Sequence, residues 1–399
     1  MFKNKKIYLT LFFLILLVVL LAIFSGTGSD YGLYLKMWSA SNAGANPWSS
    51  NFDGIKIPNN SYGPLHILLG YLALINLMMP KILIALTSVI IFMILLHAKS
   101  LEKKKIENND LFFILITYPL FPLTIISTYL IGVNDSIVAL ITILACGTRK
   151  QERMIFTGVL IGIAALLKFY PILFLAFFSL DAKKGVSLKC ILSGFLVFAI
   201  GMLIAYLIWG NEVFSPIIFG AERSPKLLSI FKFIEVIINS YYLSEASQKF
   251  LQTLLSYNSY ILLAFVMGFF LHGLMAQIEW EYVSLIGILL IFVIYKVGHP
   301  HFYLSWTAML AWVFATSPKS SSKKKFAWQL TPILIYLGFF QSLYLLSRLV
   351  DGPGMHMRND WEIFRNVGSV PFLIIVIACL FLNRNFFIKP WKKNSLFFW

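Results

Sequence analysis

Asp30 combines a reactive side chain with an unusual position in the chain. It lies in FSGTGSDYGLYLKMW (24–38), directly after 18 uncharged and mostly apolar residues. A carboxylate at the end of a membrane helix is partly desolvated, so it binds a proton more tightly than it would in bulk water. That property suits a general base acting on a hydroxyl. The same carboxylate could also cap an amphipathic helix, DYGLYLKMWSAS, because Asp is a favoured N-cap residue. The two roles are compatible.

Two further segments place polar residues between apolar runs. GVNDS (132–136) puts Asn134 and Asp135 at a turn between two short helices, where they could bind substrate or serve as ordinary turn residues. LLKFYP (166–171) puts Lys168 at the end of an apolar helix, followed by Tyr170 and a proline. An ionisable residue at membrane depth is costly, which indicates a function, here a cation for a lipid-linked phosphate. The alternative is a lysine that only reaches to the membrane surface.

Histidines and arginines follow in the second half of the chain. YKVGHPHFYLSW (295–306) brings Lys296, His299 and His301 within six residues. A neutral histidine could accept or donate a proton, and a charged one could bind phosphate. The spacing of the two histidines is no specific signal for a metal. Arg358, in the polar segment SRLVDGPGMHMRNDWEIFR (347–365), could add a phosphate contact or belong to a solvated face.

The composition requires a membrane around these residues. The chain is 59% hydrophobic and 13% charged, with a mean hydropathy of +0.80. A soluble domain could not bury that much apolar surface, so the sequence predicts an all-α polytopic membrane protein. The net charge of +16 comes from basic clusters between apolar runs. That distribution is typical of cytoplasmic loops and argues against nucleic-acid binding. The three cysteines lie in or beside apolar stretches, which argues against disulfides and a zinc site.

Apolar length and the positions of Lys and Arg predict one integral membrane domain, 1–399, with about twelve spans and both termini in the cytoplasm. The first run is interpreted as a retained helix rather than a signal peptide. Residues 64–79 are too short to cross and are expected to lie half-buried on the outer side. The outer loops are then 25–79, 210–257 and 348–368. The predicted spans are 7–24, 80–97, 111–129, 136–147, 154–169, 171–180, 190–208, 258–273, 283–296, 302–315, 327–346 and 369–383.

The ordered set of these motifs resembles a known superfamily. YGPLHILLGYL (62–72), the NDS-to-KFYP region (134–171) and KVGHPHFYLSW (296–306) look like segments of the GT-C polytopic glycosyltransferases. The similarity is greatest to mannosyltransferases that use dolichyl- or polyprenyl-phosphate mannose, in particular the first GPI mannosyltransferase and its bacterial relatives. The family's catalytic Asp maps onto Asp30, its Asn-Asp pair onto Asn134 and Asp135, and its Lys onto Lys168. The second acidic residue of its first loop is missing, because positions 28 and 32 are Gly, and His301 replaces a Gln.

The resemblance implies an inverting glycosyltransferase with about twelve spans and outer-side juxtamembrane helices. It would move a hexose such as mannose from a polyprenyl-phosphate donor to a hydroxyl of a glycan or glycolipid on the periplasmic or lumenal face, without a cofactor. Asp30 is the expected base. The rivals are a transporter or lipid flippase, and an outer-leaflet glycan ligase. The expected substrate-binding residues are Tyr31, Trp48, Tyr62, Asn134, Asp135, Lys168, Tyr170, His299, His301 and Arg358.

Overall fold

The first apolar run forms a 20-residue helix, α1 (Lys5–Phe24), and further long apolar helices follow it. The computed structural model describes residues 5–27, 29–49, 51–52, 55–56, 60–102, 106–240, 244–318, 321–351 and 367–387. Within these ranges, five helical segments are long and apolar enough to cross a membrane. Besides α1 they contain α4 (Met79–Glu102), α10 (Leu188–Trp209), α14 (Asn258–Met275), and α17 (Ser322–Gln329) with α18 (Thr331–Asp351).

Shorter helices fill the bundle between these segments. The apolar ones are α3 (Pro64–Ile75), α8 (Met154–Leu167), α15 (Trp280–Ile294), α16 (Leu304–Thr316) and α20 (Ser369–Leu382). Other helices are α2 (Ser29–Asn42), α7 (Asp135–Lys150), α12 (Ile230–Ser240), α13 (Glu245–Ser256) and α21 (Arg384–Phe387). The core lies around α16, which is buried along nearly its whole length between α4, α7 and α15.

Two predicted spans are interrupted. Residues 111–129 form α5 (Asn108–Thr117), then α6 (Pro122–Thr124) and the π-helix η1 (Ile125–Ile131), with a bend of 47° between the two halves. Pro119 and Pro122 lie at this bend, and prolines interrupt a helix because they lack the N–H donor. If the bent pair is one span, six segments qualify.

Residues 171–180 form only η2 (Tyr170–Leu173) and α9 (Phe174–Phe178), roughly 15 Å of helix against a hydrocarbon core of about 30 Å. Helices occupy all the predicted spans, but the count of twelve stays a prediction.

Three two-stranded pairs join loop segments. β1 (Asn51–Phe52) pairs with β2 (Ile55–Lys56), and β3 (Leu180–Asp181) with β4 (Gly185–Val186), both antiparallel. The third pair is parallel and links distant parts of the chain, β5 (Lys226–Leu227) and β6 (Val297–Gly298). It ties the segment after η3 (Gly210–Phe214) and α11 (Ser215–Glu222) to the turn that enters η4 (Pro300–Tyr303).

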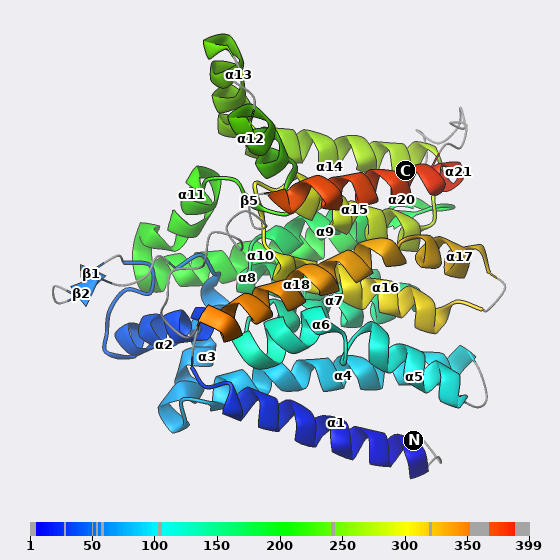
Figure 1. The fold of residues 1–399 in the computed structure, drawn as a ribbon, viewed down its shortest axis with the longest axis horizontal. Helices are drawn as coiled ribbons and strands as arrows, with labels where there is room; N and C mark the ends of the chain where they lie inside the picture. Colours follow the sequence, from blue (N-terminus) through cyan, green and yellow to red (C-terminus); the bar gives the residue numbers. More distant parts are fainter. Residues whose placement is uncertain are drawn as a thin grey trace.

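Most of the helices run roughly along one axis, and α12 and α13 project from the side of the bundle, as Figure 1 shows. α2, α3, α11 and the β1–β2 hairpin gather at one end, at the left of the picture. The start of α1, α17 and α21 lie at the other end, so the two described termini of the chain share that end. The described residues of the predicted outer loop 25–79 therefore lie at the opposite end of the bundle from α17 and α21, which belong to two of the predicted cytoplasmic Lys/Arg clusters. Most of the predicted outer loop 348–368 lies outside the described residues. Which end faces the cytoplasm stays a prediction.

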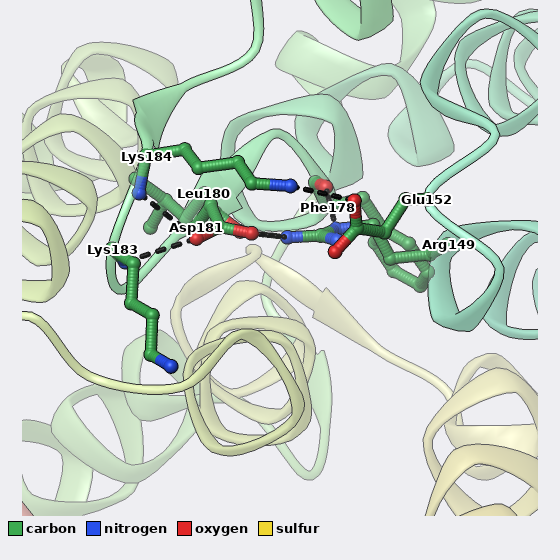
Figure 2. A network of polar contacts seen from close by, with 7 residues as sticks. All are labelled: Arg149, Glu152, Phe178, Leu180, Asp181, Lys183 and Lys184. Carbon is green, nitrogen blue, oxygen red and sulfur yellow. Dashed lines mark hydrogen bonds and ion pairs between the residues drawn. The ribbon is translucent and has the colours of Figure 1, made fainter.

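A polar network ties α7 to the end of α9 (Figure 2). Arg149, on the last turn of α7, is buried and donates to the carbonyls of Phe178 and Leu180, at 3.0 and 2.6 Å. It also forms an ion pair of 3.2 Å with Asp181, whose carboxylate accepts from the backbone N–H groups of Lys183 and Lys184. Burial opposes ionisation of Asp181, but these hydrogen bonds hold the pKa of its carboxyl below the usual value. The network fixes α9 against α7 at this end.

Candidate active site

Asp135 and Lys168 form a buried ion pair where α7 begins and α8 ends. Lys168 Nζ lies 2.6 Å from Asp135 Oδ2, and the two side chains are 7% and 0% exposed. Tyr170, at the start of η2, donates from its hydroxyl to Asp135 Oδ1 at 3.0 Å. Three consecutive helical segments therefore converge on one carboxylate. Because both charges are withdrawn from solvent and paired, the position of the lysine is tightly fixed.

Aromatic rings surround the Lys168 ammonium. Its nitrogen lies 4.3 Å from the ring centroid of Phe302, 5.3 Å from that of Tyr62 and 5.9 Å from that of Tyr170. These distances are within the range of cation–π attraction, which stabilises the charged form. An ammonium has three N–H donors, of which Asp135 accepts one. The lysine can therefore still donate to a ligand in the cavity that it lines.

The turn before α16 adds two stacked histidines. The rings of His299 and His301 lie 5.1 Å apart and nearly parallel, at 9°. His301 Nε2 is 3.8 Å from Asp135 Oδ2. Burial lowers the pKa of both imidazoles well below 6.5, and the positive charges of Lys168 and Arg223 lower it further. Both side chains are thus neutral near pH 7, and each can offer one N–H and one acceptor nitrogen.

Another wall, here called the α2–α3 wall, comes from α2 and from Ser61 and Tyr62 in the segment that leads into α3. Asp30 is the second residue of α2, within its first turn, and is partly exposed in the cavity. Its role as an N-cap stays a prediction. Tyr34, one turn later, donates to the Tyr62 hydroxyl at 2.8 Å. Burial, and then the Asp30 carboxylate, raise the pKa of the Tyr62 phenol. Behind this wall, Asn134 Nδ2 and His66 Nδ1 are 3.1 Å apart, so the α2–α3 wall is hydrogen-bonded to the GVNDS turn.

A glycine allows α3 to meet α8. The Gly63 N–H donates to the carbonyl of Leu167 at 3.0 Å, one residue before Lys168. A Cβ on Gly63 would lie 2.2 Å from the Leu166 carbonyl oxygen, which is too close for any side chain. The YGPL segment therefore needs glycine at this position, because the backbone of α8 approaches it directly.

These walls enclose one cavity of about 900 Å³. Its polar lining residues include Asp30, Tyr34, Tyr62, Lys168, Tyr170, Arg223, Lys226, Tyr295, His299 and His301. Its apolar lining residues include Ile172, Leu173, Pro216, Ile217, Leu262, Leu263 and Ile291. Ile217 of α11 and Leu263 of α14 are each half exposed. The cavity is therefore bordered both by charged groups and by exposed apolar side chains of α11 and α14.

The structure brings together most of the predicted site residues. Asp30, Tyr62, Lys168, Tyr170, His299 and His301 line the cavity, and Asn134 and Asp135 lie fully buried just behind it. Tyr31 and Trp48 lie outside the lining. The Tyr31 hydroxyl donates to the carbonyl of Leu77, and Trp48 packs against Trp209 and donates to the carbonyl of Tyr62. Arg358 lies outside the described residues. The roles of all these residues in substrate binding stay predictions.

Several lining residues were not among the predicted site residues, among them Tyr34, Arg223 and Lys226. Tyr34 follows Asp30 by four positions, so its place on the same helix face was available from the spacing. Arg223 and Lys226 are brought in by the β5–β6 pair, which no local pattern indicates. In the described part of the chain, no three His, Cys, Asp or Glu side chains gather in a way that could hold a metal ion. Independence of a metal or cofactor stays a prediction.

Comparisons with known proteins agree with this architecture. The chain is similar to ArnT from Cupriavidus metallidurans, whose crystal structure is bound to undecaprenyl phosphate. The TM-score is 0.51 at 13% identity, over 96% of this chain and 74% of that one. This likeness shows a shared GT-C fold. A search of curated proteins gave no significant match. The family model described as glycosyltransferase family 87 matches residues 61–318, which include the GVNDS turn, Lys168 and both histidines. The chain, a multi-pass membrane protein, therefore belongs to glycosyltransferase family 87.

Proposed function

We propose that this protein transfers a sugar, a hexose such as mannose, from a polyprenyl-phosphate donor to an acceptor hydroxyl at the outer face of the membrane. The observation that carries the proposal is the cavity of about 900 Å³, whose lining combines a carboxylate and cations with apolar side chains of η2, α11, α14 and α15. Its charged and hydroxyl groups suit a sugar phosphate, and its apolar side chains suit the first isoprene units. The undecaprenyl phosphate bound to ArnT, which shares the fold, supports a donor of this kind.

The reaction follows from the positions of Asp30 and Lys168. The acceptor oxygen attacks the anomeric carbon and gives its proton to Asp30, while the bond from that carbon to the phosphate oxygen breaks. A single displacement of this kind inverts the anomeric centre. The phosphate begins as a singly charged diester and leaves with a second negative charge. The Lys168 ammonium, and an N–H of a neutral histidine, would stabilise that added charge.

Asp135 then acts on Lys168 rather than on the substrate. Its carboxylate is fully buried and bonded to Lys168 and Tyr170. It would hold the lysine in one rotamer and offset the cost of burying an ammonium. The site therefore retains a cation for the phosphate. The sugar would lie between Asp30 and Lys168, beside Tyr34 and Tyr62.

The test is transfer of radiolabelled sugar from polyprenyl-phosphate mannose and polyprenyl-phosphate glucose by the purified protein in lipid. Asp30→Asn should lower transfer at least about 10³-fold, because the variant cannot accept the proton, without changing thermal stability. Asp110→Asn is the matched control, since Asp110 lies in the first turn of α5 at the other end of the bundle. Full activity of Asp30→Asn would contradict the assignment of the base. No transfer from either donor, with flipping of the donor in sealed vesicles, would favour a transporter.

A further inference from the structure

The segment Arg223–Ser229, here called the strap, crosses from α11 to α12 over the histidine turn. Its backbone pairs in parallel with the chain before η4: Lys226 N–H donates to the Lys296 carbonyl at 3.1 Å, and Leu228 N–H donates to the Gly298 carbonyl at 3.0 Å. The Tyr303 hydroxyl donates to the Leu228 carbonyl at 3.3 Å. Leu228 and Ser229 are fully buried, so the strap is part of the packed structure.

The strap is held in a strained conformation. Leu227 has φ of +51°, in the left-handed region that residues other than glycine rarely adopt. Opposite it, a Cβ on Gly298 would lie 2.5 Å from the carbonyl carbon of Leu228 and 2.7 Å from the nitrogen of Ser229. Gly298 therefore permits the close approach of the two backbones. Such strain persists only where the surrounding structure enforces it, and it clusters at ligand sites.

The strap places Arg223 on the wall of the cavity that also holds Lys168, His299 and His301. The positive charge of Arg223 also acts on both histidines, since it contributes to the lowered pKa of each imidazole. Lys168 is the cation that the sequence predicted for the phosphate, but the buried Asp135 offsets much of its charge. A leaving phosphate that gains a second negative charge would therefore benefit from another cation.

We propose that Arg223 is the second cation of the phosphate site and that the strap exists to hold it there. This inference rests on the proposed function and adds a substrate-contacting residue to it. The planar guanidinium can donate two parallel hydrogen bonds to one phosphate, which a lysine cannot do. Arg223 thereby binds the donor phosphate from the loop side, while Lys168 binds it from the side of the helices.

The experiment compares the wild type with Arg223→Gln and Arg223→Lys. Arg153→Gln is the control, because this substitution also removes one positive charge, from an exposed side chain in the turn between α7 and α8. Two quantities are measured in lipid nanodiscs: kcat/KM for the polyprenyl-phosphate sugar, and the inhibition constants of polyprenyl phosphate and of the uncharged polyprenol. Arg223→Gln should lower kcat/KM about 100-fold and raise the inhibition constant of polyprenyl phosphate at least about tenfold. The inhibition constant of polyprenol should not change, and Arg223→Lys should recover part of the loss.

The contrast between the two inhibitors separates a charge contact from a structural role. A misplaced strap would weaken both lipids equally, and that result, or wild-type behaviour of Arg223→Gln, would overturn the proposal for Arg223. If the wild-type protein transfers no sugar, direct binding of polyprenyl phosphate and polyprenol is measured by tryptophan fluorescence instead. Loss of phosphate-dependent binding in Arg223→Gln would then support the arginine site while the transferase proposal fails. Unchanged binding would count against Arg223.

Discussion

Breaking the buried pair Asp135–Lys168 should cost both stability and activity. At 2.6 Å, and with an effective dielectric constant of about 20, the attraction between the two charges is about 6 kcal/mol. Much of it is offset by desolvation, so removing one partner should lower the free energy of unfolding by about 3–5 kcal/mol. Asp135→Asn leaves the ammonium uncompensated. Lys168→Met leaves the carboxylate uncompensated and also removes the cation for the phosphate.

The double variant Asp135→Asn/Lys168→Met separates pairing from other effects. Because neither charge remains, it should lose about 3–5 kcal/mol in total, and the two single losses should not add. With about 4 kcal/mol lost in each single variant and in the double variant, the coupling energy expected from this cycle is about 4 kcal/mol. The unfolding free energy would be measured by titration with sodium dodecyl sulfate in mixed micelles, followed by tryptophan fluorescence. Transfer activity should be lost in both variants that lack Lys168, whatever their stability.

The pair Glu152–Lys184 is a matched control within the same chain (Figure 2). Its N–O distance is also 2.6 Å, but its side chains are 64% and 66% exposed. Surface ion pairs contribute little because water and salt screen them. Lys184→Gln should therefore leave the unfolding free energy unchanged within error. Additive losses in the Asp135–Lys168 cycle, or equal effects of the buried and exposed pairs, would refute the reasoning.

Three further outcomes follow from the geometry of the cavity. Gly63→Ala should lower both thermal stability and sugar transfer, because the new Cβ would collide with the Leu166 carbonyl. Gly268→Ala is the control and should change neither, because the space around Gly268 is open. Thermal unfolding and transfer assays on both variants check this. Gly298→Ala should release the strap and weaken binding of polyprenyl phosphate in the same inhibition assay, and unchanged binding would show that the strap is dispensable. Because the pKa of His301 is well below 6.5, its imidazole should stay neutral when the pH is lowered from 8 to 6.5. The pH profile of kcat/KM between pH 8 and 6 should therefore show no loss with an apparent pKa near 6.5. Such a loss in the wild type that is absent in His301→Gln would contradict this prediction.

The sequence predicted the helical segments well because hydropathy reports them directly. The predicted spans 136–147 and 154–169 put Asp135 and Lys168 at the same end of a helical hairpin, but no residue pattern predicted their ion pair. The apolar run 171–180 is short for a full crossing, yet it was predicted to be a span; it forms η2 and α9. The bend between α5 and α6 could have been read from Pro119 and Pro122.

Long-range backbone pairing was beyond the reach of sequence patterns. Lys226 and Val297 are paired, although they lie about 70 residues apart, and the pairing depends on two backbone hydrogen bonds and on a glycine. Neither the hydrogen bonds nor the glycine produces a periodic sequence pattern from which the pairing could be predicted. Aromatic residues near a membrane surface are similarly ambiguous. Trp48 and Tyr31 have aromatic rings of the kind that stack on sugars, and in the structure both rings are buried in the protein. Their role in substrate binding stays a prediction.

Two kinds of structure therefore build the site. Asp135, Lys168 and Tyr170 lie where α7 begins, α8 ends and η2 begins. Arg149 fixes the opposite end of α7 to the end of α9 through buried hydrogen bonds. Because these helices are fixed at both ends, the position of Lys168 follows from helix lengths, which hydropathy encodes. Asp30 and Arg223 come from segments outside these helices. Their residue types suggest a base and a cation, but their positions relative to Lys168 depend on the α2–α3 contact and on the strap. Only the structure therefore shows that Asp30, proposed as the base, and Arg223, proposed as the second cation, line the same cavity as Lys168.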